Sequence, residues 1–260
     1  MRYDPLKDRV FGVIRLFPGL RNIFFALLDR LLLRQRYVKR EIVAYAKEGM
    51  SFYDAGAGFC QYSSFVLKKY PLSRVFAIDL KTDYLKSFAA FSSGSFSYQS
   101  ADLQSFTPRS RYDMAIAIDI LEHIQDDVAA IQNLYTALKK EGILIISTPS
   151  DLDEAARFTE EHVRAGYRKE ELEEKLVSAG FEIEKSLYSY GIFGAASWKL
   201  MIKYPLQFLG KSRLNIILLP FWYLLVYPIC EVLMNWDLKR NNRKGNGIII
   251  VARKHNSIAT

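Results

Sequence analysis

The chain has 260 residues, of which half are hydrophobic and a quarter are charged, which excludes an intrinsically disordered protein. This length allows one large α/β domain with an appendage, or two small domains. The formal net charge of +8 favours nucleic acid, anionic lipid or anionic substrates as partners, and charge alone does not choose among them. The two cysteines, Cys60 and Cys230, are too few for a disulfide framework or a metal cluster, so we expect a reducing, cytoplasmic setting.

Residues 1–49 are basic and show helical spacing of apolar residues, which predicts amphipathic N-terminal helices. Basic residues cluster toward one end of this segment, at Arg30, Arg34, Arg36, Lys39 and Arg40. The helices could pack on the main domain or lie on an anionic membrane surface. Arg15 interrupts the early apolar residues, so no signal peptide is expected.

Residues 50–190 alternate between strand and helix patterns, which is typical of a parallel sheet covered on both faces. Strands are predicted at 51–56, 74–80, 96–103, 112–121, 143–150 and 182–190. Helices are predicted at 61–70, 82–93, 126–142 and 168–180, the last two closed by Gly142 and Gly180. The pattern predicts an α/β fold with a Rossmann-like, doubly wound, mostly parallel sheet.

Residues 191–244 break this alternation and are rich in aromatic and aliphatic side chains. Residues 245–254, GNGIIIVARK, then predict a last strand that rejoins the sheet, and 255–260 form a tail. The uncharged stretch 216–230 contains Pro220 and Pro228, and it is shorter than the ~20 apolar residues that a membrane-spanning helix needs. We therefore expect a hydrophobic helical insertion that is either a lid over the site or a monotopic membrane contact through its tryptophans and the basic run LKRNNRK.

The stretch SFYDAGAGFCQY carries the clearest chemical signal. Gly56 and Gly58 follow a strand and precede a helix, where free backbone N–H groups favour an anion such as a pyrophosphate or a carboxylate. Asp79 ends the next strand, where a carboxylate can accept hydrogen bonds from ribose hydroxyls, as in nicotinamide and S-adenosylmethionine enzymes. Gln61 replaces the third glycine of the nicotinamide fingerprint, and Asp54 would repel a pyrophosphate. The turn therefore favours S-adenosylmethionine, which carries an ammonium and a sulfonium.

Five motifs occur in the order YDAGAG, VFAID, SADL, YDMAIAIDILEHIQD and LKKEGILIISTP, followed by the segment EEHVRAGYRKEELEEKLVSAGF. In this order they resemble the class I S-adenosylmethionine-dependent methyltransferases, especially the small-molecule branch that includes quinone-biosynthesis enzymes. The resemblance covers residues 50–190 and the last strand. It implies a Rossmann-like core at 50–190. The last strand, 245–254, would complete the sheet of this core as an antiparallel strand.

The resemblance also implies roles for individual residues. Asp54, Gly56 and Gly58 would line the methionine end of the cofactor, and Asp79, with Leu80 beside it, would hold the ribose. These roles come from the family pattern at matching positions.

Further along the chain, Asp102 and Leu103 would lie beside the adenine, and Asp119 would border the methionine moiety and the mouth of the substrate pocket. His162, in the loop before the late helix, is the candidate general base for a hydroxyl acceptor. His123 is a second candidate, with a structural histidine as the alternative.

The sequence thus predicts methyl transfer from S-adenosylmethionine, by in-line displacement, to a small hydrophobic or lipid-linked acceptor. No metal site is expected. A cytoplasmic enzyme with peripheral contact to an anionic membrane surface fits the basic and aromatic appendages. Two alternatives remain open: an RNA methyltransferase, suggested by the net charge of +8, and a non-enzymatic scaffold with the same fold.

Overall fold

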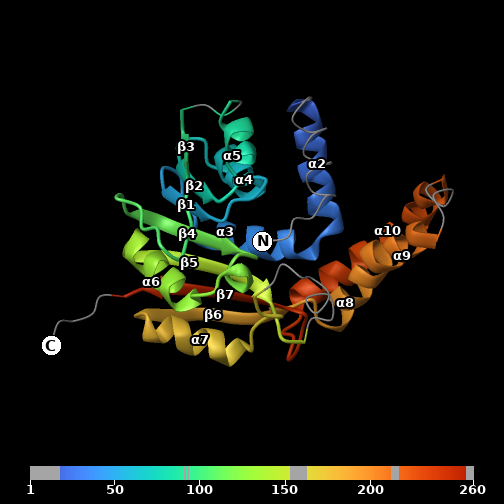
Figure 1. The fold of residues 1–260 in the computed structure, drawn as a ribbon. Helices are drawn as coiled ribbons and strands as arrows, with labels where there is room; N and C mark the ends of the chain where they lie inside the picture. Colours follow the sequence, from blue (N-terminus) through green and yellow to red (C-terminus); the bar gives the residue numbers. More distant parts are fainter. Residues whose placement is uncertain (1–17, 91, 93, 153–162, 212–216, 256–260) are drawn as a thin grey trace.

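The computed structural model describes residues 18–90, 92, 94–152, 163–211 and 217–255. Its centre is one seven-stranded sheet with the strand order β3-β2-β1-β4-β5-β7-β6 (Figure 1). The strands are β1 Ser51–Ala55, β2 Arg74–Asp79, β3 Phe96–Ser100, β4 Tyr112–Ile118, β5 Leu138–Pro149, β6 Phe181–Ser189 and β7 Gly247–Lys254.

Strands β1 to β5 pair in parallel, whereas β7 lies antiparallel between β5 and β6. This confirms the predicted doubly wound, mostly parallel sheet with a final antiparallel strand. The strand order reverses its direction at β1 and β4, so a crevice forms outside the carboxyl ends of these strands.

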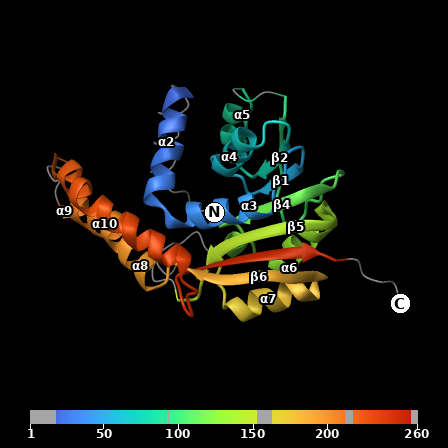
Figure 2. The same ribbon diagram turned by 180° about the vertical axis from the view of Figure 1, so that it is seen from behind.

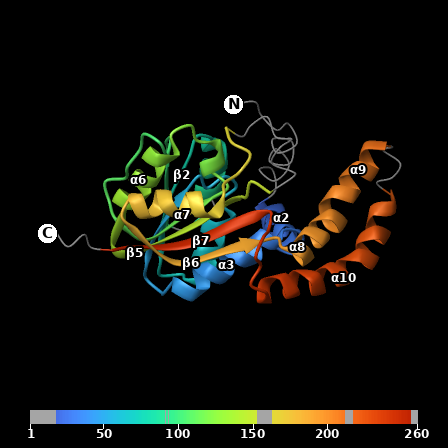
Figure 3. The same cartoon turned by 90° about the horizontal axis from the view of Figure 1, so that it is seen from below.

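Helices cover both faces of the sheet (Figures 1 and 2), and α7 and α3 lie on opposite faces when the sheet is seen from below (Figure 3). One core cluster joins α3, α4 and α5 to the sheet, and the other joins α6 and α7 to the opposite face. The helices are α2 Pro18–Leu31, α3 Leu33–Tyr45, α4 Gln61–Lys69, α5 Thr82–Ala89, the short η1 Leu121–His123, α6 Asp127–Ala137, α7 Lys169–Ser178, α8 Ile192–Trp198, the π-helical η3 Lys199–Lys203, α9 Tyr204–Lys211 and α10 Leu219–Lys239.

The helix predicted over 126–142 is shorter in the structure. Helix α6 ends at Ala137, and Leu138 already pairs with Tyr112 of β4. An irregularity follows in β5, with Glu141 at a φ of 61°. A Cβ on Gly142 would lie 2.8 Å from the carbonyl oxygen of Lys139, so this glycine serves the irregular strand rather than a helix end.

Helices α8, η3, α9 and α10 form an antiparallel hairpin that projects beyond the sheet in all three views (Figures 1, 2 and 3). Its base is fixed by the buried carboxylate of Asp237. This carboxylate accepts hydrogen bonds from the Tyr37 hydroxyl of α3 and from the backbone N–H of Gly194, both at 2.8 Å. The Arg36 guanidinium of α3 also donates a bidentate pair of hydrogen bonds to the Glu231 carboxylate of α10, at 2.7 and 2.5 Å.

We predict that Asp237→Ala destabilises the fold by about 2–3 kcal/mol, because it leaves the buried N–H of Gly194 without an acceptor and removes one of the two acceptors of the Tyr37 hydroxyl, which keeps only the backbone carbonyl of residue 237. Chemical denaturation followed by circular dichroism measures this change. Asp29→Ala is the matched control, because Asp29 pairs with Lys39 at the surface and its removal should cost less than about 1 kcal/mol. Equal effects of the two substitutions would contradict the prediction.

Candidate active site

A cavity of about 720 Å³ lies at the carboxyl ends of β1, β2 and β4. Its size is within the range of roughly 300–1,000 Å³ that small-molecule sites occupy. The N-terminal helices contribute to its wall through Phe24, Leu28 and Leu32, followed by Arg34 and Gln35 at the start of α3. No residue of the described part of the hairpin, 192–211 and 217–239, lines it.

The glycine turn between β1 and α4 forms the floor of this cavity. Gly56 and Gly58 both have positive φ, 80° and 50°, a region that other residues adopt at a cost. A Cβ on Gly56 would lie 2.8 Å from the Ile120 side chain, whereas a Cβ on Gly58 would meet nothing within 4 Å. Gly56 therefore allows close packing, and Gly58 leaves open space where a ligand can approach the backbone.

Asp79, the last residue of β2, holds this turn in place. Its carboxylate accepts hydrogen bonds from the backbone N–H groups of Gly58 and Lys81, both at 2.9 Å. Burial raises the pKa of the Asp79 carboxyl, and the bonds from Lys81 and Gly58 act against this. Leu80 follows with 53% of its surface exposed and also lines the cavity. The predicted ribose-binding pair thus lies at the cavity.

Asp102 and Leu103 line another part of the same cavity, beyond the end of β3. Leu103 is buried, whereas the Asp102 carboxylate accepts hydrogen bonds from the backbone N–H and the side-chain amide of Gln104, at 3.0 and 2.7 Å. The structure therefore brings the two predicted adenine-side residues to the same cavity as Asp79.

Asp119, just after β4, lies at the opposite end with a φ of 51°. Its backbone N–H donates to the carbonyl of Ser147 at 2.8 Å, and its carboxylate forms an ion pair with Arg34. Burial alone would lower the pKa of Arg34, but Asp119 and the nearby Tyr62 hydroxyl raise it, so the guanidinium is fully charged. Arg34 and Asp119 also line a smaller cavity of about 110 Å³, together with Thr148, Tyr190 and Trp198.

Three buried polar atoms at this end have no hydrogen-bond partner among the described residues: Nε of Arg34, Oε1 of Gln35 and Oε1 of Gln61. All three residues line the large cavity. Buried polar groups are normally hydrogen-bonded, and these three atoms are exceptions on residues of the cavity wall. Sequence reasoning missed Arg34 and Gln35 as site residues. The sequence shows them only as polar residues next to Leu33, Tyr37 and Val38 at helical spacing, a pattern that does not by itself indicate a ligand site.

Residues 53–146 match the sequence family described as methyltransferase domain. The chain is also 28% identical over 101 residues to trans-aconitate 2-methyltransferase from Enterobacter sp. (strain 638). That match covers 39% of this chain and only 40% of the length of the relative.

Two solved structures share the fold. Phosphoethanolamine N-methyltransferase 2 from Haemonchus contortus, in complex with S-adenosyl-L-methionine, is similar with a TM-score of 0.58 and 16% identity, over 84% of this chain and 53% of that chain. A SAM-dependent methyltransferase from Archaeoglobus fulgidus has a TM-score of 0.55 and 17% identity, over 94% and 99% of the two chains. Residues 53–146 therefore match a methyltransferase domain, and the chain shares its fold with S-adenosylmethionine-dependent methyltransferases.

Within the methyltransferase domain, Asp54 lies apart from the other predicted cofactor residues. It is 2% exposed and is not among the residues that line the cavity. Its carboxylate accepts a hydrogen bond from the Ser63 hydroxyl at 2.5 Å. Burial raises the pKa of Asp54 to about 7, and Asp79 nearby adds to this. Asp54 thus supports the turn from behind, through α4.

Cys60 also lies behind the turn. It has a φ of 60°, precedes α4 and is fully buried in the core rather than lining the cavity. Burial raises the pKa of its thiol well above the ordinary value, so Cys60 is present as a thiol rather than a thiolate. Glycine would adopt this positive φ at a lower cost than cysteine. The Cys60 side chain, however, fills space in the core.

The methyltransferase domain places one of the two predicted histidines at the cavity. His123 lines it within η1, and His162 lies outside the described residues. The neighbouring Glu122 is 1% exposed and accepts a hydrogen bond from the Thr148 hydroxyl at 3.2 Å. Burial, and then repulsion by Asp119, raises the pKa of the Glu122 carboxyl.

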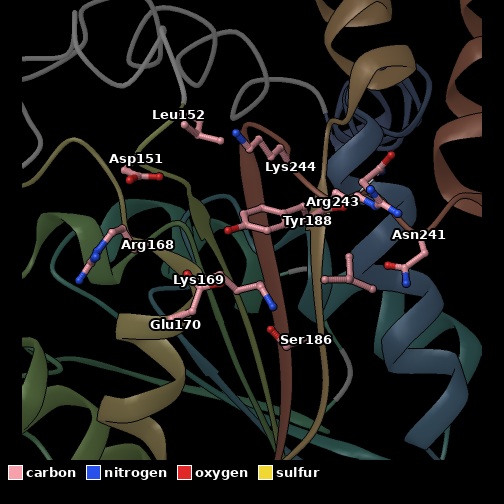
Figure 4. A pocket seen from close by; sticks show the side chains of 12 residues that line it. Asp151, Leu152, Arg168, Lys169, Glu170, Ser186, Tyr188, Asn241, Arg243 and Lys244 are labelled. Atoms are coloured by element: carbon pink, nitrogen blue, oxygen red, sulfur yellow. Dashed lines mark hydrogen bonds between the residues drawn. The ribbon is translucent and has the colours of Figure 1, made fainter.

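A separate, open groove of about 530 Å³ lies between the start of α7, the outer strand β6 and the segment that follows α10 (Figure 4). None of the predicted site residues lines it. Four basic side chains line it, Arg168 and Lys169 at the start of α7 and Arg243 and Lys244 after α10, together with the acidic Asp151 and Glu170 (Figure 4). This groove is distinct from the cavity of the methyltransferase domain.

We predict that the contribution of Asp54 to the free energy of unfolding falls as the pH rises from about 4 to about 7. In the unfolded chain the Asp54 carboxyl ionises near 3.8, whereas in the folded chain it keeps its proton to about 7. The folded state therefore loses stability relative to the unfolded state across this window. Asp54→Asn cannot ionise and should flatten the dependence, which urea denaturation at pH 5 and pH 7.5 measures. Parallel pH profiles of the two proteins would show that Asp54 is ionised in the fold.

Proposed function

We propose that this protein transfers a methyl group from S-adenosylmethionine to a small acceptor. The observation that carries the proposal is the Asp79 carboxylate bonded to Gly58 on the wall of a cavity within a methyltransferase domain. When bound, the cofactor would supply an electrophilic methyl group.

The residues of the cavity fit this cofactor. Asp79 offers a carboxylate to ribose hydroxyls, with Leu80 beside it, and Asp102 and Leu103 would flank the adenine. Gly58 leaves open space beside the backbone for the methionine end.

The charges at the opposite end complement an amino-acid zwitterion. Arg34 would attract its carboxylate, and Asp119 its ammonium, in exchange for part of their mutual ion pair. Arg34 and Gln35 of α3 extend the site beyond the matched residues 53–146.

The remaining work of the chain is to align the acceptor and exclude water. Phe24, Leu28 and Leu32 form an apolar wall on the side of α2. A hydroxyl acceptor would also need a base, and His123 is the described histidine that lines the cavity. His162, the first candidate from the sequence, lies outside the described residues.

The acceptor, in this proposal, is hydrophobic or lipid-linked, such as a polyprenyl or quinone-like compound. Helix α2 supports this, because Phe24 and Leu28 line the cavity while Ile23 and Leu27 on the same helix are 57% and 46% exposed. Residues 50–190 with the last strand would be the catalytic core, and residues 191–244 a membrane contact rather than a lid. The protein would then work at an anionic membrane surface on the cytoplasmic side.

We predict that Asp79→Asn weakens binding of S-adenosylhomocysteine about ten- to hundredfold, because hydrogen bonds to a charged group contribute about 1.5–3 kcal/mol. Isothermal titration calorimetry measures this affinity. Asp83→Asn, an exposed position on α5, is the matched control and should bind like the unaltered protein. A well-folded unaltered protein that does not bind the ligand would favour the scaffold alternative.

We predict that lipid extracts from cells without the protein contain a species lighter by one methylene than its counterpart in cells with it. Mass spectrometry of the extracts detects the difference. Cells that carry Asp79→Asn in place of the natural chain should resemble cells without the protein. Identical lipid extracts, together with an altered water-soluble metabolite, would refute a lipid-linked acceptor while leaving methyl transfer intact.

A further inference from the structure

The α8–α10 hairpin carries an unusual share of the exposed apolar surface. Of the 21 large apolar side chains that are exposed among the described residues, 12 belong to segment 191–244. They are Ile192, Tyr204, Leu206, Ile217, Leu218, Phe221, Trp222, Leu224, Leu225, Ile229, Val232 and Trp236. Contiguous exposed apolar patches mark sites of contact with proteins or membranes.

On α10 these residues form one stripe along the helix. Phe221, Leu225, Ile229, Val232 and Trp236 recur at intervals of three or four residues and are 47–72% exposed. The residues that α10 buries, Val226, Cys230, Met234 and Asp237, lie on the opposite side. Helix α10 has 21 residues and is therefore about 31 Å long, so the apolar stripe extends over most of its length.

The charges of the hairpin are one-sided. Segment 191–244 contains eight lysines and arginines but only two acidic residues, a net charge of +6 out of the +8 of the whole chain. Both acids point into the protein: Glu231 is bonded to Arg36, and Asp237 is buried against Tyr37. At the base, Arg243 and Lys244 make no ion pair with described residues and lie beside the groove that also holds Arg168 (Figure 4).

Apolar surface together with excess positive charge matches an anionic lipid bilayer. A second copy of this chain would match the apolar stripe but not the charge, because two segments of net charge +6 would face each other. Trp222 and Trp236 are 37% and 53% exposed, and tryptophan favours the interface between lipid and water. None of the described helices is long and apolar enough to cross a membrane. The hairpin therefore suits insertion from one side.

The hairpin leaves the sheet at the same edge as the large cavity. Helix α8 begins directly after β6, and β7 starts opposite Pro149 and Ser189, the last residues of β5 and β6. The hairpin thus leaves the sheet at the edge where β5 and β6 end. Because β4 and β5 run in parallel, this is also the edge with the cavity (Figure 1).

We propose that the outer face of the α8–α10 hairpin inserts into the headgroup region of an anionic bilayer and holds the cavity edge of the sheet toward the lipid. The purpose of this docking rests on the proposed function: it would give the site access to an acceptor dissolved in the membrane. The docking itself depends only on the apolar stripe and the charge of the hairpin.

The protein contains its own probe for this contact. All three tryptophans, Trp198, Trp222 and Trp236, lie in the hairpin segment, so the tryptophan emission of the full chain reports on this element alone. The full chain is mixed with phosphatidylcholine vesicles with or without phosphatidylglycerol, and bound protein is measured by flotation. We expect binding to the anionic vesicles, weakened by salt, with a blue-shifted emission that brominated lipids quench.

The double variant Leu224→Gln/Leu225→Gln should lower vesicle binding about tenfold or more, because it removes two side chains that are 74% and 72% exposed on α10. Leu72→Gln/Val177→Gln is the matched control, since these residues are 76% and 57% exposed outside the hairpin, and it should bind vesicles like the unaltered chain. Both variants should keep their affinity for S-adenosylhomocysteine, which shows that they fold.

Three results would overturn the inference: no flotation with anionic vesicles, flotation without quenching by brominated lipids, or a stable dimer that Leu224→Gln/Leu225→Gln dissolves. The two proposals fail separately. A chain that binds S-adenosylhomocysteine but not vesicles keeps the proposed function and loses the docking surface. A chain that binds vesicles through the hairpin but not S-adenosylhomocysteine keeps the docking surface and loses the proposed function.

Discussion

The ion pair between Arg34 and Asp119 connects the N-terminal helices to the end of β4, and the polar end of the cavity depends on it. Asp119 stands at a positive φ, which few residues other than glycine adopt without cost. Strain of this kind persists where the surrounding structure holds it and is common at functional sites. Here a hydrogen bond to Ser147 fixes the backbone while Arg34 holds the side chain. The N-terminal segment is thereby part of the site rather than an appendage to it.

The two elements outside the core have different relations to the cavity. Helices α2 and α3 line it, whereas the hairpin contributes none of the described residues of its wall. The two elements nevertheless contact each other at the base of the hairpin. There Tyr37 and Arg36 of α3 donate hydrogen bonds to Asp237 and Glu231 of α10. The base of the hairpin is therefore bonded to the same helix that carries Arg34. This shared helix is the physical link between the proposed membrane contact and the proposed site.

Much of the core was predictable because its signals are local. Strand alternation, the glycine turn and the acidic strand ends predicted the sheet and placed Gly56, Gly58, Asp79, Asp102 and Asp119 at one edge, where the structure has them. Asp54 belongs to the same motif, but it lies within β1, before the turn, and α4 covers its side chain through Ser63. The motif alone does not show that the packing of α4 encloses this carboxylate and leaves Asp79 at the cavity.

The sequence by itself determined the doubly wound sheet, the cofactor edge and the apolar, basic character of residues 191–244, because periodicity, turn chemistry and charge are properties of short segments. Only the tertiary structure decided that Arg34, Gln35 and Gln61 share one cavity, that α2 covers it, and that the hairpin turns its apolar stripe outward. These facts depend on contacts between residues far apart in the chain. Tyr37 and Asp237, for example, are 200 residues apart, and no local pattern encodes their bond.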